Sequence, residues 1–306
     1  MIALLLLLAL ASAPGQADRA TLLKDAAAAM EAGRRDDAKR LYKEAADRFH
    51  SVAALLQLAR IQSSEGDAQG SLASLLAARA LAPNSEDVLS ALAQVALAAR
   101  LPVPAAGALE ALTRMCPDVA QYQYLLGVAM MTAGDGVRAT EALQTADRLD
   151  PGRALTLTAL GLALNSRKQY AEARAALTRS LELNPDSPPS IAALAESEVS
   201  LGDFAAAERD ARRALAASPD EATAHLVLGL VRFQEEKYAD ARDAFVKAAA
   251  ADPRSAKADY QLSLAYARLG DTAAAERSLD SYRRKLAQID ENVKAIRAAT
   301  FSMEKR

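Results

Sequence analysis

Cysteine, tryptophan and aromatic residues are scarce in this sequence. Its 306 residues include one cysteine, Cys116, no tryptophan and 4% aromatic residues. A single cysteine cannot form a disulfide within the chain, so stability has to come from packing. We interpret Cys116, beside Pro117, as incidental and not as a redox group. With 51% hydrophobic residues, the composition favours alanine-rich helices in close contact over a large aromatic core.

An excess of charge is also absent, and histidine is rare. The net charge of −2 gives no basic surface for nucleic acid, and the cluster at Arg209 is interleaved with Glu208 and Asp210. The only two histidines, His50 and His225, are far apart, so they cannot share a metal ion, and we expect His225 in the core. Phosphate-binding loops and nucleophile elbows are missing. The sequence therefore predicts no metal, no cofactor and no enzymatic activity.

Proline is infrequent but strictly spaced. Three sets of residues recur every 34 positions: Pro83, Pro117, Pro151, Pro185, Pro219 and Pro253; Leu58, Leu92, Leu126, Leu160, Leu194, Leu228 and Leu262; and Ala59, Ala93, Gly127, Gly161, Ala195, Gly229 and Ser263. A 34-residue period is typical of helix-turn-helix repeats, which stack into a solenoid. Small residues next to the leucines predict close helix crossings.

Each unit predicts two amphipathic helices. In the fifth unit, Leu157, Leu160 and Leu164 lie on one helical face, and a second helix ends before Pro185, which cannot continue it. Gly-Asp pairs supply positive φ and a helix cap between the two helices. They stand at Gly66-Asp67, Gly134-Asp135, Gly202-Asp203 and Gly270-Asp271. In the third unit the turn is Leu101-Pro102-Val103-Pro104, with Pro104 in the first turn of the next helix.

These residues resemble the tetratricopeptide repeat family. The match runs through Leu157, Leu160-Gly161, Tyr170, Ala173, Leu177 and Pro185 in the fifth unit, and through Leu228-Gly229, Tyr238, Ala241, Phe245, Ala248 and Pro253 in the seventh. The resemblance implies an all-α, right-handed superhelical solenoid at residues 18–289, with about eight units. Their bounds are 19–51, 52–85, 86–119, 120–153, 154–187, 188–221, 222–255 and 256–289. The first unit departs from the pattern, with His50 in place of proline, as a terminal repeat can.

The N-terminus predicts export. Ile2 to Ala13 is an apolar run, apart from Ser12, of the length of a signal-peptide core and too short to span a bilayer. We expect cleavage after Ala17, which makes residues 1–17 a signal peptide and puts the mature protein in the periplasm or outside a bacterial cell. The alternative is an uncleaved segment or a misassigned start. No membrane span is expected after cleavage.

A concave groove is the expected binding surface, because the resembling family uses first-helix positions there. In the fourth unit, Leu126, Gly127 and Met130 are needed for packing, so neighbouring positions face elsewhere. The predicted groove residues are Tyr124, Val128, Met131, Leu155, Leu162, Leu226, Leu230, Phe233, Tyr260 and Leu264. Being apolar, they predict an apolar or amphipathic partner segment, with Phe233, Tyr260 and Tyr124 as anchors. Alternatively, some pack against the next repeat. Arg60, Gln94 and Glu196 are scattered singly and do not support a carboxylate clamp.

The C-terminal residues carry an apolar stripe. Its members are Leu279, Tyr282, Leu286, Ile289, Val293 and Ile296. We expect a helix at 290–306 that caps the solenoid, or else a contact with another chain, including a homo-oligomer. The sequence thus predicts an exported, non-enzymatic adaptor that binds another protein. The alternative is a structural subunit of an envelope assembly that associates through its ends or convex face; an enzyme ranks third.

Overall fold

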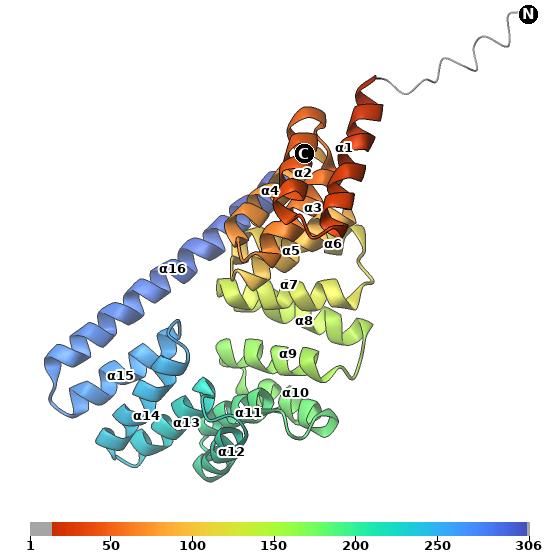
Figure 1. Cartoon of the computed structure of the whole chain (residues 1–306). Helices are drawn as coiled ribbons and strands as arrows, with labels where there is room; N and C mark the ends of the chain where they lie inside the picture. The colour runs from red at the N-terminus through yellow and green to blue at the C-terminus, as the bar shows by residue number, and fades with distance from the viewer. Residues whose placement is uncertain (1–13, 305–306) are drawn as a thin grey trace, which may run out of the picture. The chain divides into compact units, whose positions relative to one another are not determined.

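The computed structural model describes residues 14–304, and within them every regular element is an α-helix (Figure 1). The all-α prediction is therefore confirmed, and successive helices pair as the predicted repeats require. The helices are α1 (Pro14–Glu31), α2 (Arg35–Phe49), α3 (Val52–Ser64), α4 (Ala68–Leu81), α5 (Glu86–Ala98), α6 (Pro102–Met115), α7 (Ala120–Ala133), α8 (Gly136–Leu149), α9 (Ala154–Ser166), α10 (Tyr170–Leu183), α11 (Pro188–Leu201), α12 (Phe204–Ala217), α13 (Ala222–Gln234), α14 (Tyr238–Ala251), α15 (Ala256–Arg268) and α16 (Thr272–Glu304). Of the predicted signal peptide, residues 1–13 lie outside the described residues.

The chain forms two compact units that divide between Met115 and Cys116. Unit 1 contains helices α1 to α6, and unit 2 contains α7 to α16. The sequence predicts one uninterrupted array, because its period runs through this boundary without a slip. The division falls between the third and fourth repeats, so each unit is built from whole repeats.

The turns within repeats follow the predicted chemistry. Asp67, for example, caps α4 by accepting a hydrogen bond from the Gly70 N–H at 2.8 Å. The residue before the cap takes positive φ in every repeat from the second onward, because the chain has to reverse there. These residues are Gly66, Arg100, Gly134, Lys168, Gly202, Glu236 and Gly270. Three of the seven are therefore side chains held in a conformation that favours glycine. In the third repeat, α6 begins at Pro102, so Pro104 lies in its first turn as predicted.

The small residues act as contact points between paired helices. A Cβ added to Gly127, Gly161 or Gly229 would overlap a side chain sixteen residues further along. The side chains that fill these places are Leu143, Leu177 and Phe245, each fully buried. The backbone of the first helix therefore lies directly against a large residue of the second helix, as the small-residue spacing predicts.

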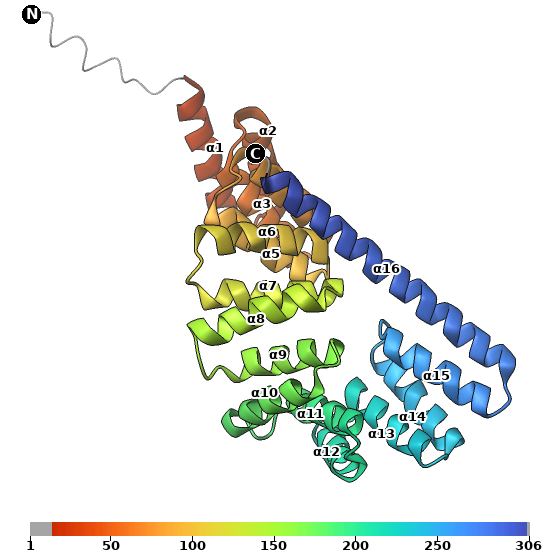
Figure 2. The same ribbon diagram turned by 180° about the vertical axis from the view of Figure 1, so that it is seen from behind.

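The C-terminal helix differs from the expectation. α16 is one continuous helix from Thr272 to Glu304, so residues 290–304 are its C-terminal part and not a separate element. Figures 1 and 2 show it as a straight rod within unit 2 that leaves α15 and runs toward the α7–α8 end. A helical stripe that continues without a breaking residue has no reason to stop at the end of the last repeat.

Candidate functional site

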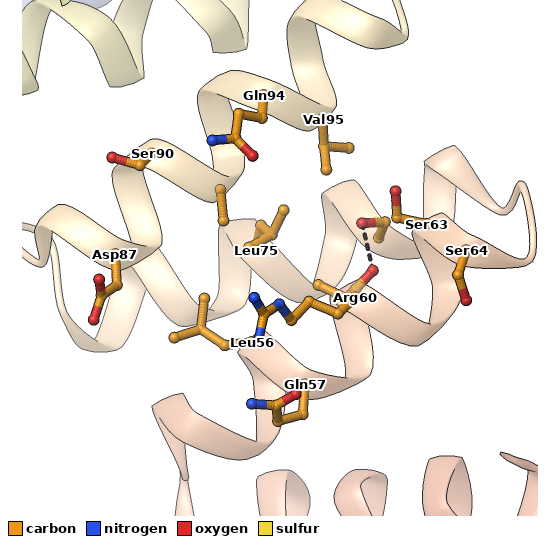
Figure 3. A pocket seen from close by; sticks show the side chains of 13 residues that line it. Leu56, Gln57, Arg60, Ser63, Ser64, Leu75, Asp87, Ser90, Gln94 and Val95 are labelled. Carbon is orange, nitrogen blue, oxygen red and sulfur yellow. Dashed lines mark hydrogen bonds between the residues drawn. The ribbon is translucent and has the colours of Figure 1, made fainter. Parts of the chain in front are cut away.

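A cavity of about 720 Å³ lies in unit 1, between α3, α4 and α5. Figure 3 shows its lining side chains, with Arg60 from α3 and Asp87, Ser90 and Gln94 from α5. The second and third repeats thus contribute their first helices to opposite sides of one hollow. Binding sites are commonly concave surfaces of this size with a few polar groups in a mainly apolar wall.

Helical spacing explains why these side chains meet. Asp87, Ser90, Ala91 and Gln94 follow the i, i+3, i+4, i+7 pattern of a single helical face. α3 presents Leu56, Gln57, Arg60, Ser63 and Ser64 on the opposite side. Arg60 and Gln94 are 34 residues apart, so they hold the same place in successive repeats.

The cavity floor is apolar. Leu75 of α4 lines it and is only 1% exposed. The Ser71 hydroxyl of the same helix donates to the Ala59 carbonyl oxygen at 2.9 Å, the dashed line in Figure 3. This bond links α4 to α3 at the cavity.

Arg60 is the cation of this site. It is exposed, and among the described residues it has neither a hydrogen-bond nor an ion-pair partner. Arg48 of α2, by comparison, pairs with Glu44 at 2.7 Å. A guanidinium without an internal partner keeps its donors available for a carboxylate. Asp87 is likewise exposed and without a partner in the described residues, so the rim offers both signs of charge.

The predicted groove residues of unit 2 differ widely in exposure. Leu155 is 60% exposed and Tyr260 is 41% exposed. The half-buried members are Tyr124, Val128, Met131, Leu162, Leu230, Phe233 and Leu264. Leu226 is only 5% exposed. Only some of the predicted groove residues therefore lie at the surface.

Part of the predicted groove belongs to the packing between repeats. Leu226 lies in a core cluster with Phe245 and Leu262, and Leu230 and Phe233 pack against this cluster. A buried Leu226 has no surface to offer a partner, so its assignment to the groove was wrong. The reason is that α15 packs against the same face of α13, which the alternative interpretation in the sequence had allowed.

The three expected aromatic anchors do not form one cluster. Phe233 meets Tyr238 edge-on, with ring centroids 5.2 Å apart. Tyr260 lies 5.3 Å from Tyr282 of α16, and the Arg153 guanidinium stands 5.1 Å from the Tyr124 ring. Each aromatic ring is therefore engaged by a local neighbour.

Side chains suited to metal binding do not gather in the described part of the chain. No three His, Cys, Asp or Glu side chains within it form a possible metal site. His225 is half-buried rather than in the core, with Nε2 2.8 Å from the Pro219 carbonyl oxygen. Burial, followed by the nearby Asp210 carboxylate, raises the pKa of Glu198 to about 7. None of the helices in residues 14–304 has the length and apolar character that a bilayer crossing demands.

Comparison with known proteins identifies the repeats. One tetratricopeptide repeat model matches residues 90–154, 192–256 and 230–288, and a second such model matches residues 154–187. The chain belongs to the tetratricopeptide repeat family. Repeats of this family generally form non-enzymatic scaffolds for protein–protein interaction. A search of curated proteins finds no significant match to this tetratricopeptide repeat protein.

Solved structures agree on the fold. A tetratricopeptide repeat protein from Parabacteroides merdae is 16% identical, with a TM-score of 0.61, and the match covers 81% of this chain and 98% of that one. PilW, described as a type IV pilus biogenesis factor, is 19% identical with a TM-score of 0.53 over 69% of this chain and 96% of its own. At these identities the likeness establishes the solenoid fold of the tetratricopeptide repeats and nothing more.

The cavity in unit 1 was missed from the sequence, although two of its residues were noticed. Arg60, Gln94 and Glu196 appear in the sequence analysis only as single residues that do not support a carboxylate clamp. The signal that could have found the site is the shared place of Arg60 and Gln94 in consecutive repeats, since equivalent positions on neighbouring first helices face a common surface.

Proposed function

We propose that this tetratricopeptide repeat protein is an exported, non-enzymatic scaffold that binds an amphipathic segment of a partner protein on the first helices of its repeats. The unit 1 cavity is the primary site. The observation that carries this proposal is a cavity with Leu56 and Val95 in its walls and, at its rim, an exposed Arg60 that has no internal partner among the described residues. Export is supported by the apolar run from Ile2 to Ala13.

The cavity favours a particular kind of segment. Leu56 and Val95, both half-buried, offer apolar contact on the two sides of the hollow. Arg60 suits an acidic side chain of the partner, because a guanidinium binds a carboxylate through two parallel hydrogen bonds. An amphipathic segment with one acidic residue beside its apolar side chains matches this arrangement.

The exposed members of the predicted groove in unit 2 extend the proposal. Leu155 and Tyr260 are large apolar side chains at the surface, where solvent contact is unfavourable. With Tyr124, Val128, Met131, Leu162 and Leu264 they are the proposed secondary contacts for a partner.

The charge preference of unit 1 tests the proposal. A random peptide library displayed on phage is selected on the full mature chain, and the enriched peptides are measured again on Arg60→Gln. We expect peptides with one acidic residue among apolar ones, and a tenfold to hundredfold loss of affinity on Arg60→Gln, from about 1.5–3 kcal/mol for a hydrogen bond to a charged group.

Arg48→Gln is the matched control, because Arg48 is an exposed arginine of the same unit that lies outside the cavity. It should leave the affinity unchanged. Equal losses from both variants would show a general charge effect and contradict the proposed site. Selection of peptides without acidic residues would also contradict it.

A further inference from the structure

The C-terminal half of α16 contacts the turn between α7 and α8. From Thr272 to Ile289 the helix is about 26 Å long, at about 1.5 Å per residue. At that distance Ile289 lies against Gly134, so closely that any side chain there would overlap it. Two turns further, the Arg297 guanidinium lies 3.9 Å from the Asp135 carboxylate.

The other Gly-Asp turns show that this contact is specific. A Cβ added to Gly66, Gly202 or Gly270 would meet no atom within 4 Å, whereas at Gly134 it would overlap Ile289. Asp135 is only 5% exposed, while its counterparts in the other three turns are exposed. The four turns share sequence and backbone conformation. Gly134-Asp135 is therefore the one of these four turns in which the aspartate is buried and α16 lies against the glycine.

α16 also joins the two ends of one row of helices. The first helices of the repeats in unit 2 contact one another in the order α7, α9, α11, α13 and α15. α16 packs along α15 and reaches α7, so it connects the last member of this row with the first. Figures 1 and 2 both show α16 crossing between these helices.

We propose that residues 286–298 of α16 form a strap, which docks reversibly on the Gly134-Asp135 turn and controls access to the first helices of unit 2. This inference concerns unit 2 and does not depend on the cavity in unit 1. The strap is an intramolecular switch. When it is docked, it covers the row of first helices, and when it is released, it exposes both this row and the apolar stripe of α16.

The contacts of α16 differ before and after residue 286. Before residue 286 the helix is firmly held, since Lys285 pairs with the buried Asp259 at 2.7 Å and Tyr282 packs on Tyr260. Beyond it the ion pair of Arg297 with Asp135 is long, at 3.9 Å, and Arg297 is 69% exposed. Ile296, within the same segment, is only 2% exposed. An exposed ion pair of this kind is weak and sensitive to salt.

Thiol labelling measures the docking directly. Cys116→Ser removes the only native thiol, and single cysteines are then introduced as Ile289→Cys in the contact or as Leu286→Cys, at an exposed position one turn earlier. We expect the thiol from Ile289→Cys to react with a maleimide at least about tenfold more slowly than the thiol from Leu286→Cys. Low urea concentrations should not change this rate, because the strap opens without global unfolding.

Gly134→Ala is the displacing variant and Gly202→Ala its matched control. The two glycines have φ of +87° and +89°, so alanine strains both turns alike, but only Gly134 touches α16. We expect Gly134→Ala to raise labelling at Ile289→Cys to the rate at Leu286→Cys, and Gly202→Ala to leave it unchanged. Equal labelling rates at the two cysteines, with Gly134 unchanged, would overturn the proposal. So would a thiol at Ile289→Cys that is labelled only when the whole protein unfolds, or whose labelling rate does not change with Gly134→Ala.

Discussion

Glu198 gives this protein a pH dependence of stability that its structure lets us calculate. The side chain lies near the end of α11 and is 8% exposed, and its Oε2 atom accepts no hydrogen bond among the described residues. Burial raises its pKa to about 7 from an ordinary value of 4.5, helped by the Asp210 and Asp203 carboxylates and opposed by Arg209. Between pH 4.5 and about 7, Glu198 is therefore protonated in the folded state and ionised in the unfolded state.

The sign and size of the effect follow from proton linkage. Where the folded state binds more protons than the unfolded state, the free energy of unfolding falls as pH rises, here from about 4.5 through about 7. At about 1.4 kcal/mol per pH unit the displacement of this pKa amounts to about 3 kcal/mol. Because solvent still screens part of the carboxylate, we expect about 1–2 kcal/mol.

Glu198→Gln removes the titrating group and keeps the shape of the neutral acid. Urea unfolding followed by circular dichroism should show this variant gaining about 1–2 kcal/mol over the wild type at pH 8 relative to pH 5. Glu182→Gln, at an exposed position on α10, is the control and should show no such trend. A difference between Glu198→Gln and the wild type that stays constant from pH 5 to pH 8 would refute the reasoning.

Three further substitutions test the packing of the repeats. Gly161→Ala should lower the free energy of unfolding in urea by about 1 kcal/mol, because overlap with Leu177 outweighs the gain in helix propensity. In a Leu177→Ala background the same substitution should be stabilising. Stabilisation in both backgrounds would contradict the close contact. Asn165→Ala should cost about 1–3 kcal/mol, since the buried amide donates to the Ala193 carbonyl oxygen at 2.8 Å, and an unchanged midpoint would show that this bond is not needed. Glu236→Gly should raise the thermal midpoint by relieving a φ of +60°, a gain of about 0.5–1 kcal/mol, and a lower midpoint would rule out strain there.

The repeat fold could be predicted because its determinants are local. The small residue at Gly161 faces Leu177 within one helix pair, and Asp67 caps the helix that directly follows it. Both interactions span few residues, so the 34-residue period carries them into every repeat. The division between Met115 and Cys116 has no such signal, because the 34-residue spacing of the recurring residues does not change there.

The candidate site needed the tertiary structure. Leu226 was assigned to the groove because helical spacing shows which face it occupies but not that α15 covers that face. The contact of Ile289 with Gly134 joins the first repeat of unit 2 to the helix that ends its last repeat. It depends on the summed curvature of five repeats, which no single repeat reveals. Arg60 and Gln94 were visible in the sequence, but only the folded repeats bring them to one cavity.

The central claim, that a partner segment occupies the cavity of unit 1, is tested most directly by site-specific photo-crosslinking in the producing cell. A benzophenone amino acid is placed at Gln94, in the cavity, or at Leu76, an exposed position on α4 outside it. The account predicts a discrete crosslinked product from Gln94 that disappears with Arg60→Gln and is absent from Leu76. The same product from both positions, or one that persists with Arg60→Gln, would contradict it.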